Sequence, residues 1–218
     1  MADGLHIEWL GRVPYDEALA RQAQAVEARR AGACGDRLLL LEHPPVVTLG
    51  RSAREANLRT PRAQLAARGV AVREVARGGD VTWHGPGQLV GYLIVDLAAR
   101  ELRDAHAFLR TVEAALAAAL AGLGVEADGR EGMTGVFVAG SRPPRKLASI
   151  GLGLRGWITW HGFALNVTTA PDAFDDIVPC GLHGVVMTSV ARELGGAPPA
   201  LFDEARAAVA RAFAERLA

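Results

Sequence analysis

The chain has 218 residues, of which 50% are hydrophobic and 22% are charged, so it can fold as one domain around a sizeable core. Its 24 Lys and Arg residues balance its 24 Asp and Glu residues, which excludes a global charge that would draw it to nucleic acid or to a membrane surface. We therefore expect a single domain over residues 1–218, which meets charged partners only through local patches.

The predicted elements follow the chain from a first strand to a closing helix. Pro14 in a first turn and Gly32 as a stop delimit the first helix, and Asp104 is placed as the N-cap of the third. The expected strands are 6–10, 38–42, 46–49, 70–75, 89–97, 135–139, 147–154 and 157–167, and the expected helices are 14–31, 61–67, 105–121 and 201–217. Because the strands cluster without βαβ alternation, the pattern predicts an α+β fold with a mixed β-sheet core and flanking helices.

Cysteine usage and the apolar pattern bear on the compartment. Cys34 and Cys180 are the two cysteines and cannot build a disulfide framework. The first residues lack a basic region followed by an apolar one, so we expect no signal peptide, and no apolar run is long enough to span a bilayer. We predict a protein of the reducing cytoplasm.

The segment Arg77–Gln88 concentrates glycine, proline and histidine. Its glycines let backbone N–H groups approach a ligand and hold a developing oxyanion. The segment is interpreted as a binding loop, with an elaborate turn around a core Trp as the alternative. It lacks the Gly-Lys-Ser/Thr ending of a phosphate-binding loop. His84 and His161 each lie between a Trp and a Gly, and either could line a pocket, with a purely structural histidine as the alternative.

A glycine pattern at 151, 153 and 156 matches the dinucleotide fingerprint, but aromatic and β-branched residues follow it where a helix is required. We interpret it instead as a hairpin that turns at Arg155-Gly156. This register places Lys146 opposite Leu165. Side-chain alternation also places Lys146 on one strand face with Ala148, Ile150, Leu152 and Leu154.

Lys146 is the single lysine among the 24 basic residues. An amine on an apolar face loses its hydration, which favours the neutral base; the alternative is a strand-end lysine that reaches solvent. Cys180 lies in the irregular segment Pro179-Cys180-Gly181, and a thiol beside a cation favours its thiolate, the attacking form. The alternatives for Cys180 are a small buried hydrophobe, or half of a zinc site with His183 for which no second half exists.

Five motifs together resemble one family of enzymes. They are, in order, Glu42–Arg51, Arg77–Gln88, Lys146–Gly151, Trp160–Asn166 and Pro179–Gly181. Their order and spacing resemble those of the lipoyl(octanoyl) transferases, which move octanoyl from acyl carrier protein to lipoyl domains. Leu93 stands where that family commonly has proline, a difference at a strand that does not touch the chemistry.

The resemblance implies a fold like the catalytic domain of biotin and lipoate protein ligases. It implies that Cys180 takes the octanoyl group as a thioester and that Lys146 is its acid/base partner. The implied substrate-binding residues are Arg77, Gly78, Gly79, Asp80, Val81, Thr82, Trp83, His84, Ser149, Ile150, Gly151, Gly162, Phe163 and Ala164.

The same resemblance implies no metal and no cofactor, since the acyl group arrives on the phosphopantetheine of acyl carrier protein. The implied partners are octanoyl-acyl carrier protein, the lipoyl domains of 2-oxoacid dehydrogenase E2 subunits and the glycine cleavage H protein, with no nucleic acid and no membrane. Three alternatives remain: an ATP-dependent lipoate ligase on the same fold, a non-catalytic module that binds lipoyl domains, and a thioesterase that releases octanoate.

Overall fold

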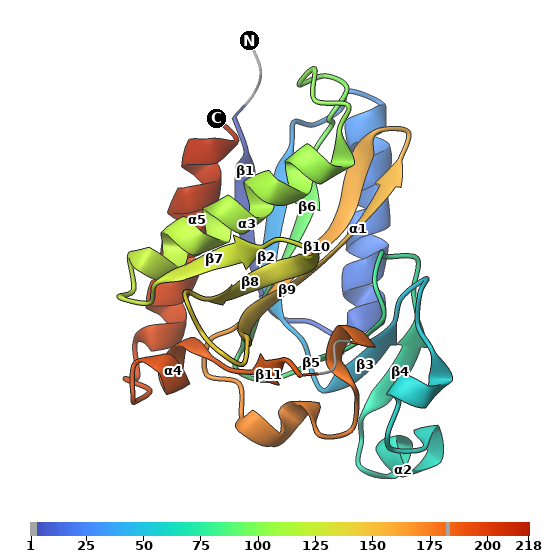
Figure 1. Cartoon of the computed structure of the whole chain (residues 1–218). Helices are drawn as coiled ribbons and strands as arrows, with labels where there is room; N and C mark the ends of the chain where they lie inside the picture. The colour runs from blue at the N-terminus through green and yellow to red at the C-terminus, as the bar shows by residue number, and fades with distance from the viewer. Residues whose placement is uncertain (1–3, 182–183) are drawn as a thin grey trace.

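A mixed β-sheet is the centre of the fold (Figure 1). The computed structural model describes residues 4–181 and 184–218, with the backbone alone for Pro171 and Cys180. In this part of the chain, eight strands form the main sheet in the order β1-β2-β6-β10-β9-β8-β7, with β11 paired to β9. Their bounds are β1 His6–Arg12, β2 Arg37–Glu42, β6 Gln88–Ile94, β7 Ala127–Arg130, β8 Met133–Val138, β9 Arg145–Arg155, β10 Ile158–Asn166 and β11 Val186–Met187. The pairs β1–β2 and β11–β9 are parallel and the others antiparallel, so the predicted α+β fold with a mixed sheet is confirmed.

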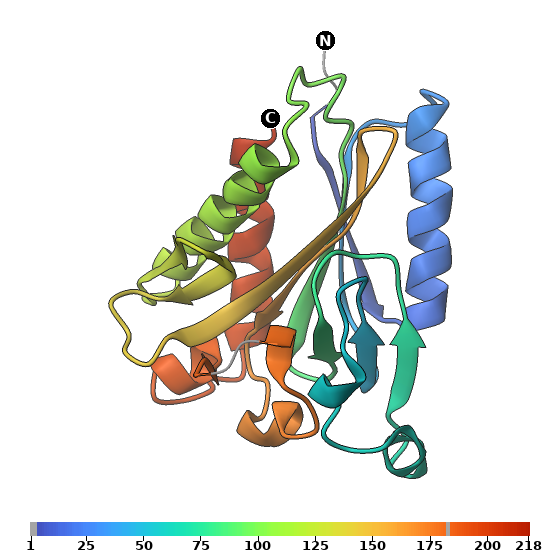
Figure 2. The same cartoon turned by 45° about the vertical axis from the view of Figure 1, so that its right-hand side comes forward.

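Helices cover both faces of this sheet. Figure 2 shows α1 on one side and α3 with α5 on the other. The larger apolar core lies between the sheet and the pair α3 and α5, and a second cluster lies under α1. The helices are α1 Tyr15–Arg30, α2 Arg62–Ala67, α3 Ala105–Ala121, α4 Val190–Glu193 and α5 Leu201–Arg216. Asp104 caps α3 as predicted, because its Oδ1 accepts hydrogen bonds from the backbone N–H groups of His106 and Ala107. None of the helices in the described ranges is long and apolar enough to cross a bilayer.

A smaller sheet packs beside the main one and carries part of the candidate site. Its order is β4-β3-β5, with bounds β3 Val46–Leu49, β4 Ala71–Glu74 and β5 Val81–His84. The predicted break at His43-Pro44-Pro45 is where the chain leaves the main sheet for this one. His43 anchors the crossing, since its two ring nitrogens lie 2.7 Å from the Val13 carbonyl oxygen and 2.7 Å from the Tyr92 hydroxyl. Short 3₁₀ turns η1 Glu55–Asn57, η2 Pro171–Phe174 and η3 Pro179–Gly181 complete the described elements.

The hairpin of β9 and β10 is present as predicted, but its register is not. The turn residues are Gly156 and Trp157, with φ of 59° and 68°, the two positive angles that a two-residue turn of type I′ requires. Arg155 therefore faces Ile158, and Leu165 faces Ala148 instead of Lys146. The predicted pairing of Lys146 with Leu165 is wrong by two residues.

A second correction concerns the face on which Lys146 lies. The register between β8 and β9 shifts between the pairs Val136–Ala148 and Phe137–Lys146. Leu147 and Ala148 consequently both pack in the core under α3 and α5, so the alternation of side chains is interrupted. Lys146 instead shares the opposite face with Phe137, and its Nζ lies 5.4 Å from the centre of that ring.

Candidate functional site

The residues 77–80, which we call the glycine loop, cross from strand β9 towards the turn that contains Cys180. The Gly78 N–H donates to the Leu152 carbonyl oxygen of β9 at 2.9 Å. A Cβ on Gly50 would lie 2.3 Å from the Gly79 carbonyl oxygen, so glycine is required where the two backbones meet. Gly79 itself has a φ of 84°, which disfavours other residues there.

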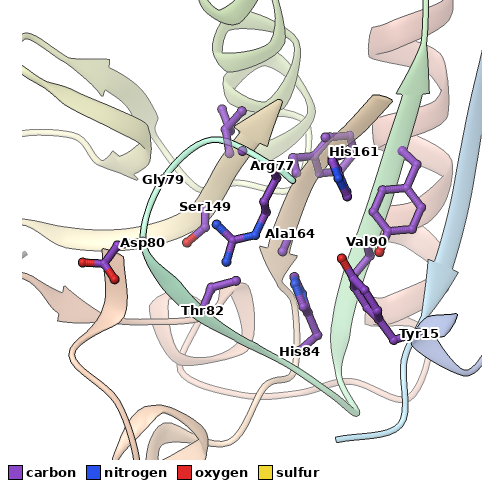
Figure 3. Close-up of a pocket in the computed structure, with 15 residues that line it drawn as sticks. Tyr15, Arg77, Gly79, Asp80, Thr82, His84, Val90, Ser149, His161 and Ala164 are labelled. Carbon is purple, nitrogen blue, oxygen red and sulfur yellow. The ribbon is translucent and has the colours of Figure 1, made fainter. Parts of the chain in front are cut away.

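Arg77 is the anchor of the glycine loop and lies in the middle of a pocket (Figure 3). Its side chain is buried, and its Nη2 donates to the backbone oxygen and to the hydroxyl of Thr48, both at 2.9 Å. Its Nη1 donates to the Gly78 carbonyl oxygen at 3.0 Å. These bonds hold a guanidinium in place within the site, where it can stabilise negative charge.

The pocket around Arg77 encloses about 470 Å³, measured to its open mouth. Eleven of the fourteen predicted substrate-binding residues line it, and they come from the glycine loop, β5, β9 and β10. They are Arg77, Gly79, Asp80, Thr82, His84, Ser149, Ile150, Gly151, Gly162, Phe163 and Ala164. The structure thus brings three separate predicted segments to one cavity.

The remaining three predicted residues lie elsewhere. The side chains of Val81 and Trp83 pack in the apolar cluster of the small sheet, because alternate residues of a strand point to opposite faces. Gly78 lines an adjoining groove between β9 and α3. The prediction of one continuous binding segment overlooked the β5 strand within it.

Four further lining residues were not among the predicted substrate contacts: Tyr15, Val90, Tyr92 and His161. For His161 the Trp-His-Gly context, shared with His84, was the available signal. Tyr15 in the first turn of α1 and the two residues of β6 carry no local signal, because only the packing of distant elements brings them to the cavity.

Small residues keep the pocket open between β9 and β10. A Cβ on Gly162 would lie 2.1 Å from the Gly91 carbonyl oxygen, and one on Gly151 would lie 3.0 Å from that of Gly78 and 3.1 Å from Arg77 Cδ. Ser149 points into the same space (Figure 3). A side chain at Gly162 would displace the backbone of β6, and one at Gly151 would displace the glycine loop.

The titratable groups at the deep end of the site are buried and neutral. Burial lowers the pKa of His43 to about 4 and that of His161 to about 3, with Arg77 contributing to the second. Burial, with the nearby His43, also lowers the pKa of His84 well below its usual range. Burial raises the pKa of Tyr15 to about 12. At neutral pH these residues act as uncharged hydrogen-bonding groups.

Asp80 joins the glycine loop to the turn of Cys180. One carboxylate oxygen accepts from the Asn57 amide, and the other accepts from the backbone N–H groups of Arg54 and Val81 at 3.2 and 2.7 Å. Gly181 lies against this carboxylate, since a Cβ there would be 2.6 Å from Asp80 Oδ2. The Cys180 backbone, within η3, is therefore next to the Asp80 end of the pocket. Its sulfur lies outside the described part of the chain.

Lys146 is buried, with 1% of its surface exposed. A Cβ on Gly135 would lie 3.2 Å from Lys146 Nζ and 2.6 Å from its Cε, so the amine occupies space that only a glycine leaves open. Strand β11, which follows the Cys180 turn, pairs with β9 at Arg145 and Lys146. The chain thus returns from Cys180 to run beside the predicted base, and a solvent-exposed strand-end lysine is excluded.

Other predicted features have simpler outcomes. The Gly78 N–H, which lies in the segment predicted to supply oxyanion donors, already donates to the Leu152 carbonyl oxygen, and the Gly181 N–H donates to that of Val178. Within residues 4–181 and 184–218, no group of His, Cys, Asp and Glu could hold a metal ion. His183, which with Cys180 would form half of a zinc site, lies outside the described residues. Cys34 is a free cysteine.

Comparison with known proteins gives a consistent group of relatives. Residues 14–214 match the description "lipoyl protein ligase A/B catalytic domain". The octanoyltransferase of Myxococcus xanthus is 48% identical over 206 residues, which are 94% of this chain and 57% of that protein. The octanoyltransferase of Acidobacterium capsulatum is 45% identical over 217 residues, which are 96% of this chain and 88% of that protein. The chain therefore spans little more than half of the first relative and most of the second.

Solved structures agree on the fold. A bi-partite lipoate protein ligase from Thermoplasma acidophilum, solved in a study that included its E2 lipoyl domain, superposes with a TM-score of 0.70 at 18% identity, covering 98% of this chain and 84% of that one. Biotin protein ligase from Aquifex aeolicus, in complex with biotin and ATP, superposes with a TM-score of 0.56 at 12% identity, covering 97% and 70%. The predicted likeness of fold to biotin and lipoate protein ligases is confirmed.

Proposed function

The chain belongs to the lipoyl protein ligase A/B catalytic-domain family, and from that membership we propose that it is an octanoyltransferase that acts through Cys180 and Lys146. The acyl donor is octanoyl-acyl carrier protein, and the acceptor is a lysine amine of a lipoyl domain, in E2 subunits of 2-oxoacid dehydrogenases or in the glycine cleavage H protein. The observation that carries the proposal is the pocket lined by the glycine loop, whose Asp80 lies against Gly181 next to Cys180, together with the burial of the single lysine, Lys146.

The first half-reaction forms an acyl-enzyme. Lys146 accepts the thiol proton of Cys180, and the thiolate attacks the carbonyl carbon of the octanoyl thioester. The bond from that carbon to the pantetheine sulfur breaks, and Lys146 returns the proton to the departing sulfur. The octanoyl group is then held on Cys180, with its chain in the pocket lined by Ile150, Phe163 and Ala164.

The second half-reaction transfers the acyl group to nitrogen. Lys146 accepts a proton from the acceptor amine, which attacks the acyl-enzyme carbonyl and forms an amide. The carbon–sulfur bond to Cys180 breaks, and the thiolate regains the proton. Because a thioester is a more activated acyl group than an amide, the reaction needs no nucleotide and no further cofactor. We propose the cytoplasm as its compartment, where a free thiol persists.

Intact mass after mixing with octanoyl-acyl carrier protein, without ATP, tests this proposal. A hydroxylamine-labile octanoyl adduct is expected on the wild type and on Cys34→Ala, the matched control at the other cysteine, but not on Cys180→Ala. Subsequent addition of a lipoyl domain should remove the adduct and modify one of its lysines. An unmodified enzyme, together with an unmodified lipoyl domain, would contradict the proposal.

The same experiment separates the alternatives. An ATP-dependent ligase, which shares this fold, would label the lipoyl domain only from free octanoate with ATP. A thioesterase would release octanoate without any protein acceptor. A binding module would retain lipoyl-domain affinity in Cys180→Ala and produce no labelled species in any arm.

A further inference from the structure

His161 has a backbone conformation that is rare for a residue with a side chain. Its φ is 58° although it lies within strand β10. Left-handed conformations cost energy for residues other than glycine and persist only where the surroundings enforce them, often at functional sites. The strained backbone of His161 in the wall of the pocket therefore indicates that its surroundings hold it in this conformation.

Two buried side chains enforce this conformation by replacing bonds of the sheet. The register of β10 on β6 begins with Gly162 opposite Tyr92 and would next pair His161 with Leu93. Instead, the His161 N–H donates to Oε1 of Gln22 at 2.8 Å. The Thr159 hydroxyl donates to the Leu93 carbonyl oxygen at 2.6 Å and accepts from the Val95 N–H at 3.0 Å. Gln22 and Thr159 thus supply bonds in place of those that the sheet would make at His161 and Leu93.

This arrangement turns the imidazole of His161 into the pocket. Its Nε2 is buried and, within the described residues, has no hydrogen-bond partner. The ring packs against Trp160, with their centres 4.2 Å apart. In Figure 3, His161 and Tyr15 lie at one end of the pocket and Asp80 at the other. The end remote from Cys180 is therefore polar, and burial keeps both of its residues uncharged.

Between the two ends, Arg77, Thr82 and His84 line the pocket (Figure 3). The positions of β9 and β10 beyond Ser149 are apolar or glycine there, and their span matches a medium acyl chain. Ser149 lies near the Asp80 end, and His161 is opposite Leu152, three residues further along β9. At the rise of a strand this interval is about 10 Å, comparable with an extended octanoyl chain. Gly151, Gly162 and Ala164 lie along it, whereas the Phe163 ring packs against Phe213 of α5 in the core.

We propose that His161, together with the hydroxyl of Tyr15, is a polar stop that limits the acyl chain of this pocket to the length of octanoyl. The inference rests on the proposed function, since it assumes that the acyl group enters from Cys180. An octanoyl chain ends short of the stop. A longer chain would press apolar methylene groups against the imidazole and the Tyr15 hydroxyl, which gain no hydrogen bond from it, so the pocket rejects it.

Three variants distinguish the effect of the polar groups at positions 15 and 161 from the effect of side-chain size. Tyr15→Phe removes only the hydroxyl, and His161→Gly removes the imidazole and relieves the positive φ. His161→Asn, the control, keeps a polar group at a position where Asn tolerates that φ. The rate of acyl-enzyme formation is measured with octanoyl- and dodecanoyl-pantetheine, and the quantity compared is the dodecanoyl-to-octanoyl ratio.

The ratio should rise about tenfold or more in His161→Gly and about threefold or more in Tyr15→Phe, while His161→Asn stays within about twofold of the wild type. Unchanged ratios in the first two variants would overturn the inference. An equal rise in His161→Asn would show that bulk alone sets the limit, and would overturn it too.

Calorimetry on the same proteins measures the affinity of the pocket for free octanoic and dodecanoic acids, which is independent of thioester chemistry. Failure of the wild type to form an octanoyl adduct refutes the proposed function. A wild type that forms the adduct but binds and transfers both chain lengths equally refutes only the polar stop.

Discussion

Replacing Gly181 by alanine tests how firmly the turn that carries Cys180 is held against the glycine loop. Gly181 follows the predicted nucleophile directly and has a φ of 62°. A Cβ at this position would lie 2.6 Å from Asp80 Oδ2 and 3.2 Å from Asn57 Nδ2. The substitution therefore strains the backbone and also pushes the carboxylate away from the groups that bind it.

The two effects can be estimated separately. The left-handed backbone costs alanine about 1–2 kcal/mol, and weakening one hydrogen bond to the Asp80 carboxylate costs about 1.5 kcal/mol or more. We expect the free energy of unfolding to fall by about 2–4 kcal/mol. Because a shift of about 1 Å near the reacting atoms can reduce a rate about 100-fold, acyl-enzyme formation should slow by a similar factor.

Urea denaturation and single-turnover acylation measure these two quantities. Gly195→Ala is the matched control, because Gly195 has a φ of 74° but no atom lies within 4 Å of its added Cβ. It should show the backbone cost alone and leave acylation unchanged. In a cycle with Asp80→Ala, the coupling energy between positions 80 and 181 should reach about 1 kcal/mol. Additive effects, or equal losses in Gly181→Ala and Gly195→Ala, would refute the contact.

The remaining predictions concern the base, the buried histidines and a buried ion pair. Lys146→Arg should lose octanoyl transfer as fully as Lys146→Ala, because arginine keeps the charge but does not release a proton; retention of a tenth of the wild-type rate would argue against the acid/base role. The depressed pKa values of His43 (about 4) and His161 (about 3) mean that, below the unfolded value of about 6.5, only the unfolded chain gains these protons. Stability is thus fully present above that pH and falls by up to about 1.4 kcal/mol per pH unit per histidine on acidification; urea titrations from pH 7 to 5 should show a smaller slope for His43→Gln than for the wild type, and equal slopes would contradict this account. Asp36→Asn should cost about 3–5 kcal/mol in thermal or chemical denaturation, since this buried carboxylate accepts bonds of 2.8 and 2.6 Å from two arginine side chains; a loss below about 1 kcal/mol would contradict that account.

Turn and cap residues made many elements predictable in advance. Asp104 caps α3, the two prolines after His43 mark the passage between sheets, and Gly156 lies in the turn of the β9–β10 hairpin. Each of these signals acts within a few residues and depends on backbone angles or unpaired N–H groups. It can therefore be recognised in the sequence without the rest of the fold. Strand β5 was missed because it lies in the glycine-rich segment that was interpreted as a loop, and β11 because two residues show no period. Strand β7 was missed although β3 and β4, which also have four residues, were predicted.

The geometry of the site was harder to predict from the sequence. Lys146 was expected on the face of Ala148, but the register shift between β8 and β9 moves it to the other face. No residue near Lys146 signals that shift, in which β9 has one residue more than β8 between the two pairs. The sequence left a buried and a solvent-exposed Lys146 both open, and the structure decides for the buried one and for the side of the sheet on which it lies.

From the order of its residues alone, this chain specifies an α+β fold, a glycine-rich binding loop, one unusual lysine and a cysteine in an irregular turn. Each of these features belongs to a short segment of the sequence, where periodicity and turn-forming residues are enough to predict it. Only the tertiary structure gathers Tyr15, Tyr92 and His161 at the end of one pocket and lays β11 beside Lys146. Those contacts join segments far apart in the chain, and they form because buried polar groups such as those of Gln22 and Thr159 must find partners once the core excludes water.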